Sequence, residues 1–230
     1  IRNNYPDTNT ERIVVIPHGV DQEQWPYGYR PSVEWLDAWY AKYPQLRDKQ
    51  VLTLPGRITR LKGHRDFIEL IGRLKVAGQP VHGLIVGGED PKRKAYAREL
   101  HELVAGRGLQ SDITFTGQRS DIREIYAVSD IVFSLSTKPE SFGRTVLEAL
   151  SLGRPVVGYD HGGVGEVLGD CYGEGAVAPE RPEMLFEKVQ TVLTKPVQMP
   201  ADLPYLLGDM LTQTLNLYSS LLNKTVTSRS

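Results

Sequence analysis

This sequence has a single cysteine, nearly balanced charges and no long hydrophobic segment, and each of these features argues against a class of protein. Cys171 is the one cysteine in 230 residues, which excludes an internal disulfide and a cysteine-rich zinc site and fits the reducing cytoplasm. The 27 basic and 28 acidic residues leave a net charge of −1, a balance that favours neither a nucleic-acid partner nor an anionic membrane. Nothing in the sequence resembles a signal peptide or a run of about eighteen apolar residues, so we expect no membrane span.

Short apolar runs alternate with helical patterns along the chain. The runs are continuous, which is typical of strands buried on both faces of a parallel sheet. We therefore predict a Rossmann-like α/β fold, in which helices cover both faces of a doubly wound parallel sheet. The predicted strands are residues 13–16, 51–54, 81–86, 113–115, 131–135, 156–159 and 175–177. The predicted helices are residues 32–43, 64–76, 91–105, 119–128, 144–152, 182–193 and 203–222.

The ends of the chain have looser patterns than its middle. Residues 11–194 carry nearly all of the strand and helix patterns. A domain of this size can bury about 70% of its unfolded surface, so its core needs no disulfide or structural metal. We expect residues 1–10 to be a connection between domains. Residues 195–230, in which prolines precede a leucine-rich helix, are expected to form an appended arm.

The segment between the predicted strand at 131–135 and the helix at 144–152 is the most informative about function. Glu140 lies in the loop, and Glu148 lies eight residues later, inside the helix. The turn at 141–143 opens a helix N-terminus, whose unpaired N–H groups and dipole bind phosphate or sugar oxygens. Carboxylates beside such a site can accept hydrogen bonds from hydroxyl groups. The segment therefore predicts a phosphorylated carbohydrate as the ligand.

Arg57 and Lys62 lie in a glycine-flanked loop that follows the predicted strand at 51–54. Ligands of doubly wound sheets bind beyond the carboxyl ends of the strands, where this loop lies. Arginine supplies a planar fork and lysine a mobile point charge, a pairing that suits a diphosphate. The loop is not a Walker A motif, because its lysine is not followed by serine or threonine.

Two other motifs indicate what the site does not use. The glycines Gly163, Gly165 and Gly169 do not have the spacing of a dinucleotide fingerprint, and we expect a tight turn there that lets backbone reach a ligand. No Asp-x-Asp pair is present to hold a metal bound to a diphosphate. We therefore expect no metal and no cofactor. His18 and His161 match no zinc pattern, and they either line the site or pack as ordinary polar residues.

All three tryptophans, Trp25, Trp35 and Trp39, lie in one short segment together with several tyrosines. The apolar residues between 33 and 43 recur at helical spacing, which predicts a packed amphipathic helix. Sugar stacking or membrane contact is the alternative for these rings.

Together these motifs resemble the C-terminal, donor-binding domain of the retaining glycosyltransferases of group 1 (family 4), which have the two-domain GT-B architecture. The similarity extends from residue 13 to about residue 193. Its most specific part is residues 140–148, which match the E-x7-E signature of that family. The Gly-Arg and Lys-Gly pairs at 56–57 and 62–63, and the glycines before Glu166, support it.

The resemblance implies three catalytic residues. Arg57 and Lys62 would hold the diphosphate of the donor and stabilise the negative charge that develops on it. Glu140 would position the transferred sugar together with the backbone N–H groups of Phe142 and Gly143.

The same resemblance implies further donor-binding residues. Glu148 would accept hydrogen bonds from the ribose hydroxyls, and Thr145 and Val146 would offer backbone N–H groups to phosphate. Gly117 and Arg119 would lie near the nucleobase. The other donor-binding candidates are Gly19, Ser141, His161, Gly162 and Gly163. The family usually has asparagine where this chain has His18.

The implied function is a metal-independent hexosyl transfer with retention, from a UDP- or GDP-linked sugar, in bacterial surface-polysaccharide or lipopolysaccharide assembly. The enzyme would be cytoplasmic and compatible with peripheral association at the inner face of the membrane. Such enzymes also have an N-terminal acceptor domain, which we expect to be missing here, so that the chain alone would be inactive. The alternatives are a nucleotide-sugar-binding subunit that needs a partner and a sugar-nucleotide epimerase.

Overall fold

The computed structural model describes residues 9, 11, 13–89, 94–195 and 199–227. Contacts divide the chain into two units, one of Gln22–Pro204 and one of Ile1–Asp21 together with Tyr205–Ser230. Apart from residues 9 and 11, the first twelve residues lie outside the described part, and with them most of the expected connection at 1–10. Residues 196–198 of the expected arm also lie outside it.

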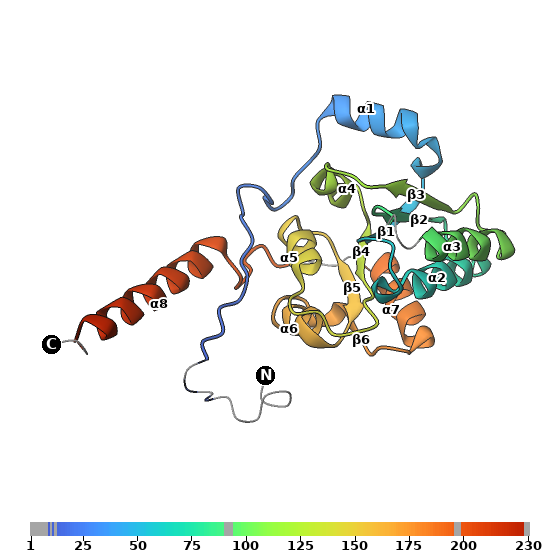
Figure 1. Ribbon diagram of the computed structural model, residues 1–230. Helices are drawn as coiled ribbons and strands as arrows, with labels where there is room; N and C mark the ends of the chain where they lie inside the picture. The colour runs from blue at the N-terminus through green and yellow to red at the C-terminus, as the bar shows by residue number, and fades with distance from the viewer. Residues whose placement is uncertain (1–8, 10, 12, 90–93, 196–198, 228–230) are drawn as a thin grey trace. The chain divides into compact units, whose positions relative to one another are not determined.

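The larger unit is built on a six-stranded parallel sheet (Figure 1). The strand order across the sheet is β3-β2-β1-β4-β5-β6, so β1 lies beside β4 at the centre. This is the doubly wound, Rossmann-like arrangement that the sequence predicts. The strands are β1 (Gln50–Pro55), β2 (Val81–Val86), β3 (Ile113–Gly117), β4 (Ile131–Ser134), β5 (Val156–Tyr159) and β6 (Ala176–Val177).

Helices precede, connect and follow these strands. They are α1 (Val33–Lys42), α2 (His64–Val76), α3 (Lys94–Gly106), α4 (Ile122–Ala127), α5 (Arg144–Ser151), α6 (Gly162–Cys171) and α7 (Pro182–Thr194). Three short 3-10 turns, η2 (Pro44–Leu46), η3 (Arg60–Lys62) and η4 (Gly173–Gly175), complete the described elements of this unit.

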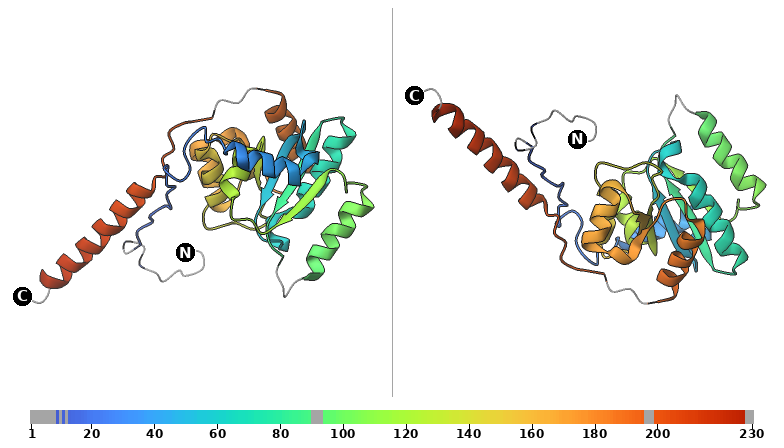
Figure 2. Two further views of the ribbon diagram at one scale, coloured as in Figure 1. Left: turned by 90° about the horizontal axis from the view of Figure 1, so that it is seen from above. Right: turned by 90° about the horizontal axis from the view of Figure 1, so that it is seen from below.

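The sheet is buried on both faces, because neighbouring residues of β1 belong to different hydrophobic clusters. Leu52 packs in one cluster with Phe67 of α2 and Leu185 of α7. Val51, next to it, packs in the other cluster with Trp39 of α1 and Ile125 of α4. Figure 2 shows helices on both sides of the sheet. Burial on both faces explains why the strands are continuous apolar runs in the sequence.

Helix α1 carries the aromatic segment into this core. The Ser32 hydroxyl accepts a hydrogen bond from the Trp35 backbone N–H at 3.2 Å and caps the helix N-terminus. The Trp35 and Trp39 rings stack with centroids 5.0 Å apart, and Trp39 is 3% exposed. The prediction of a packed amphipathic helix is therefore confirmed.

The smaller unit contains an extended segment and a long helix, α8 (Leu207–Thr227). The Val20 N–H donates to the Tyr205 carbonyl at 2.9 Å, and the Leu207 N–H donates to the Val20 carbonyl at 3.0 Å. These bonds form a parallel bridge between Val20 and Leu206. None of the helices in the described ranges is long and apolar enough to cross a membrane.

Two sequence predictions are wrong. Residues 13–16 form no strand, and Val14 and Val15 are exposed because this segment finds no ladder partner among the described residues. The glycine-rich segment at 162–171 is a helix, α6, rather than a tight turn. Its glycines disfavour a helix, but Val167 and Leu168 are fully buried, so tertiary packing overrides the low local propensity.

Several predicted helix bounds also shift. The helix predicted at 119–128 is the shorter α4, and the one predicted at 203–222 is α8, which begins four residues later and ends five residues later. The start predicted at residue 91 lies outside the described residues, and α3 is described from Lys94.

Two buried histidines make the stability of the larger unit depend on pH. His64 and His82 are 0% and 2% exposed. Burial lowers the pKa of each from its ordinary value of 6.5 to about 4. Between those values the unfolded chain binds more protons than the folded one, so stability is full above about pH 6.5 and falls as the pH drops toward 4.

We expect urea unfolding at pH 7.5, 6 and 5 to show this loss, on the order of 3 kcal/mol for each histidine over the whole window. The variant His82→Gln should have a shallower pH dependence, because the substituted side chain does not titrate. His101→Gln, at an exposed histidine, is the matched control and should keep the wild-type dependence. Parallel pH profiles for wild type and His82→Gln would contradict the assignment.

Candidate functional site

The carboxyl ends of β1 and β4 mark the switch point of the sheet. The chain passes from β1 toward β2 and β3 on one side, and from β4 toward β5 and β6 on the other. The connections that follow these two strands therefore leave in opposite directions and open a crevice between them. The loop at 56–63 follows β1 and the loop at 135–143 follows β4, so both expected ligand-binding segments lie at this point.

The two loops touch through Gly63. Its φ of 71° lies in the left-handed region, and a Cβ atom there would come within 2.0 Å of the Leu135 carbonyl oxygen. Nearby, the Thr137 N–H donates to the Leu61 carbonyl at 2.8 Å. Only glycine allows this approach, which places Lys62 of the first loop against Glu140 of the second.

Lys62 and Glu140 form an ion pair across the switch point. The Lys62 Nζ lies 2.8 Å from the Glu140 Oε1, and both side chains are about one-third exposed or less. The Ser136 hydroxyl donates to the same carboxylate oxygen. Opposite charges and a second donor at one site are the arrangement needed to hold a carboxylate in a fixed position.

The start of α6 supports this carboxylate from the backbone side. The Gly163 N–H donates to the Glu140 carbonyl at 2.8 Å, and Gly162 forms a parallel bridge with Glu140. A Cβ atom on Gly163 would lie 2.3 Å from the Phe142 Cα. His161 donates from Nε2 to the Ser136 carbonyl at 2.7 Å.

Glu148 lies on α5 and is mostly buried. Its side chain is 13% exposed, and its Oε1 accepts a hydrogen bond from the Arg144 Nε at 2.7 Å. Burial raises the pKa of the Glu148 carboxyl, and the bond to Arg144 opposes that rise. Burial, together with the Glu148 charge, raises the pKa of Tyr126, and a side-chain hydrogen bond with Thr145 opposes that rise.

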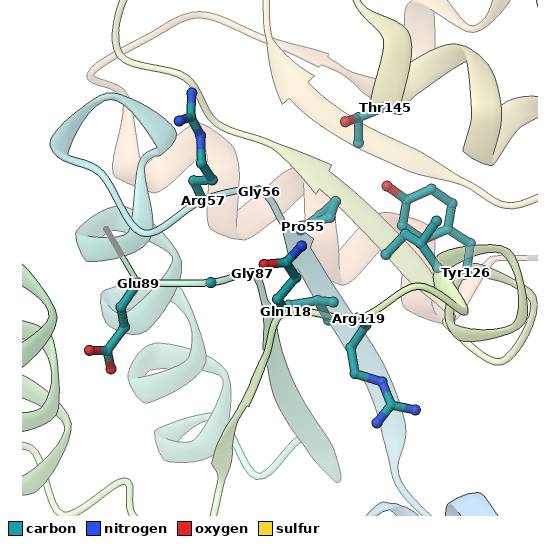
Figure 3. A pocket seen from close by; sticks show the side chains of 12 residues that line it. Pro55, Gly56, Arg57, Gly87, Glu89, Gln118, Arg119, Tyr126 and Thr145 are labelled. Atoms are coloured by element: carbon teal, nitrogen blue, oxygen red, sulfur yellow. The ribbon is translucent and has the colours of Figure 1, made fainter. Parts of the chain in front are cut away.

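A pocket of about 560 Å³ lies beside the carboxyl ends of β1, β2 and β3 (Figure 3). Its size falls in the usual range for small-molecule sites. Arg57 from the loop after β1 and Thr145 from the start of α5 contribute to its wall. The lining residues are Pro55, Gly56, Arg57, Val86, Gly87, Gly88, Glu89, Gln118, Arg119, Ile122, Tyr126 and Thr145.

The two arginines of the pocket differ in their partners. Arg57 is exposed, and its side chain has no hydrogen bond or ion pair with any described residue. Arg119 donates two bonds of 2.8 and 2.6 Å to Asp121, and its guanidinium lies 5.6 Å from the Trp39 ring centroid. The Arg57 guanidinium is therefore available to a ligand, whereas the Arg119 guanidinium already binds the Asp121 carboxylate.

The predicted site residues thus fall into three places. Arg57, Arg119 and Thr145 line the pocket, and Gly117 ends β3 next to the lining residue Gln118. Lys62 and Glu140 form the ion pair, with His161, Gly162 and Gly163 around it and Ser141, Phe142 and Gly143 in the turn that leads to α5.

Two predicted residues contribute differently from the rest. The Val146 side chain is fully buried in the core, so only its backbone could meet a ligand. Gly19 belongs to the smaller unit, where a Cβ atom would lie 2.2 Å from the Leu206 backbone.

Sequence reasoning missed several residues of this site. Gln118 and Glu89 lie in loops whose glycines and charges are visible in the sequence, but nothing singles out these two side chains. Tyr126 is an aromatic residue of a short helix and has the pattern of an ordinary core residue. Ser136 is 3% exposed, and its contact with Glu140 is visible only in the fold.

No three His, Cys, Asp or Glu side chains converge as metal ligands within the described ranges. The expectation of metal-independent chemistry stays a prediction. Burial raises the pKa of Cys171 to about 11, which keeps its thiol protonated at neutral pH.

Comparison with known sequences identifies a family. The family model described as "Glycosyl transferases group 1" matches residues 37–205. The lipopolysaccharide core biosynthesis mannosyltransferase LpsB of Rhizobium meliloti is 32% identical over 155 residues, which are 67% of this chain and 42% of that protein. The chain spans 36–42% of the length of eight curated relatives that it matches.

Solved structures with the same fold include two longer proteins. A glycosyltransferase from Rickettsia africae has a TM-score of 0.84 and 25% identity, over 96% of this chain and 61% of that one. HepE from Anabaena, crystallised with UDP and glucose, has a TM-score of 0.81 and 23% identity, over 93% of this chain and 58% of that one.

The close approach of α6 to the turn at 141–143 can be tested with two glycines of the same helix. Gly163→Ala should destabilise the protein by about 1–3 kcal/mol, because its Cβ would meet the Phe142 backbone. Gly169→Ala, at an exposed position with nothing within 4 Å, should stabilise by about 0.5–1 kcal/mol through helix propensity. Thermal unfolding measures both, and a shift of the same sign and size in both variants would contradict the packing described.

Proposed function

This chain belongs to the group 1 family of glycosyl transferases, and we propose that it is the part of such an enzyme that binds the donor, a nucleotide-diphosphate sugar. The chain has the Rossmann-like fold found in glycosyltransferases of the GT-B architecture. The observation that carries the proposal is the junction at the β1/β4 switch point, where Lys62, Glu140 and the start of α5 converge next to a pocket.

The electrostatics of this junction suit a diphosphate. Arg57 is exposed and has no described partner, and Lys62 lies on the same loop after β1. Across the crevice, α5 begins at Arg144, and its first N–H groups add a partial positive charge of about half a unit. Together they would hold the diphosphate and stabilise the charge that develops on it when the glycosidic bond breaks. Such a site needs no metal ion.

The two glutamates would have separate tasks. Glu148 is mostly buried and interacts electrostatically with Tyr126, which lines the pocket with Thr145, so it would accept hydrogen bonds from the ribose. Glu140 lies in the loop before α5, paired with Lys62, and would face the sugar. The nucleobase would then occupy the pocket near Gln118, with the diphosphate between the two carboxylates.

The reaction would be a hexosyl transfer with retention of configuration, in which the acceptor attacks from the side of the leaving diphosphate. We propose that it requires an acceptor-binding part in addition to the residues described. The curated relative in Rhizobium meliloti acts in lipopolysaccharide core biosynthesis, which supports a bacterial surface glycan as the product. HepE from Anabaena was crystallised with UDP and glucose, which supports UDP as the first nucleotide to test.

Calorimetric titration of the chain with UDP, GDP and ADP tests the proposal directly. We expect one of the three to bind with a dissociation constant between about 1 μM and 1 mM, which corresponds to about −8 to −4 kcal/mol. A folded chain that binds none of the three would overturn the donor-binding function.

The role of Glu148 can be tested in the same experiment. Glu148→Ala should weaken binding of the preferred nucleotide by about tenfold or more, because it removes charged hydrogen bonds to the ribose. Glu187→Ala changes an exposed glutamate of α7 and is the matched control. The 2′-deoxynucleotide should bind wild type more weakly than the ribonucleotide and should bind Glu148→Ala as weakly as the ribonucleotide does. Unchanged affinity in Glu148→Ala would remove the ribose role.

A further inference from the structure

Glu140 uses only one of its two carboxylate oxygens within the described structure, and Ser136 is one of the groups that hold that oxygen. From this geometry we infer that Ser136 is a positioning residue for the donor sugar. Together with Lys62 it orients Glu140 so that the second oxygen, Oε2, can accept a hydrogen bond from a hydroxyl of the transferred sugar. This inference rests on the proposed donor-binding function and adds a residue and a hydrogen-bond direction to it.

The contacts of the carboxylate are asymmetric. Oε1 accepts from the Lys62 ammonium at 2.8 Å and also from the Ser136 hydroxyl. Oε2 has no hydrogen-bond donor among the described residues. An ionised carboxylate only accepts hydrogen bonds, so the group that binds Oε2 must be a donor such as a sugar hydroxyl.

Ser136 is fixed by its own surroundings. It lies two residues beyond the end of β4, and it is 3% exposed. Its carbonyl oxygen accepts from the His161 Nε2 at 2.7 Å, so that ring nitrogen carries the proton. A residue that is buried and held through its backbone can present its hydroxyl in one direction without losing further side-chain freedom on binding.

The backbone of Glu140 is held as firmly as its side chain. The Gly163 N–H donates to the Glu140 carbonyl at 2.8 Å, and the bridge to Gly162 fixes the peptide on the same side. With its carbonyl bound, Glu140 can still turn its side chain about the side-chain bonds. Ser136 and Lys62 restrict that rotation by holding Oε1.

Lys62 and Ser136, which both bind Oε1, would respond differently to a bound nucleotide sugar. Lys62 is charged and about one-third exposed, so a diphosphate can attract its ammonium away from Glu140. Ser136 is uncharged and buried, so a phosphate does not compete for it in this way. We therefore assign to Ser136 the part of the positioning that persists in the complex. His161 acts through Ser136 and holds it from the opposite end.

The test compares a nucleotide with the corresponding nucleotide sugar. The pairs are UDP and UDP-glucose, GDP and GDP-mannose, and ADP and ADP-glucose, titrated into the full chain by calorimetry. For the pair that binds wild type, we expect Ser136→Ala to weaken binding of the nucleotide sugar by about tenfold and binding of the nucleotide by less than about twofold. A hydroxyl with a merely structural role would not separate the two ligands.

Ser134→Ala is the matched control, because Ser134, the last residue of β4, has a buried hydroxyl that makes no hydrogen bond with Glu140. If Ser136→Ala does not fold, Ser136→Cys keeps a similar volume with a much weaker donor and should show the same selective loss. Equal weakening of both ligands, or an unchanged affinity for the nucleotide sugar, would overturn the inference while leaving nucleotide binding established. Failure of all three nucleotides to bind wild type would instead reject the donor-binding function on which it rests.

Discussion

The contact between the loop after β1 and the end of β4 is the constraint on which the rest of the site depends. A side chain at Gly63 would collide with the Leu135 carbonyl, so the two loops meet only because that position is glycine. Their contact brings Lys62 within 2.8 Å of Glu140 across the centre of the sheet. Without this contact, the cation of the first loop and the carboxylate of the second would not be held within ion-pair distance.

A second close approach completes the arrangement. The start of α6 packs against the turn at 141–143 through Gly163, and the Gly163 N–H binds the Glu140 carbonyl. The loops after β1, β4 and β5 are thereby joined around one carboxylate. The junction is held together by an ion pair and backbone hydrogen bonds, and the pocket lies open beside it. This division suits a site that binds a charged group tightly and a nucleoside beside it.

Much of the fold was predictable because its signals are local. Strands β1, β2 and β5 are continuous apolar runs, and helices such as α2 have a regular apolar face, so their positions follow from periodicity. Residues 13–16 were predicted wrongly because an apolar run cannot show whether a partner strand exists. Helix α6 was missed because its glycines lower helix propensity, while the packing of Val167 and Leu168 that forms it is not local.

The same division applies to the candidate site. The order of residues along the chain is enough to predict which residue types follow each strand, and hence the Arg57–Lys62 loop, the Glu140–Glu148 segment and the family they resemble. Which of these side chains meet depends on the folded chain. In the folded chain Lys62 forms an ion pair with Glu140, and Arg119 forms one with Asp121. The Ser136 hydroxyl donates a hydrogen bond to the Glu140 carboxylate. The physical reason is that a hydrogen bond or ion pair depends on distances set by sheet order and loop contact, which no spacing along the chain contains.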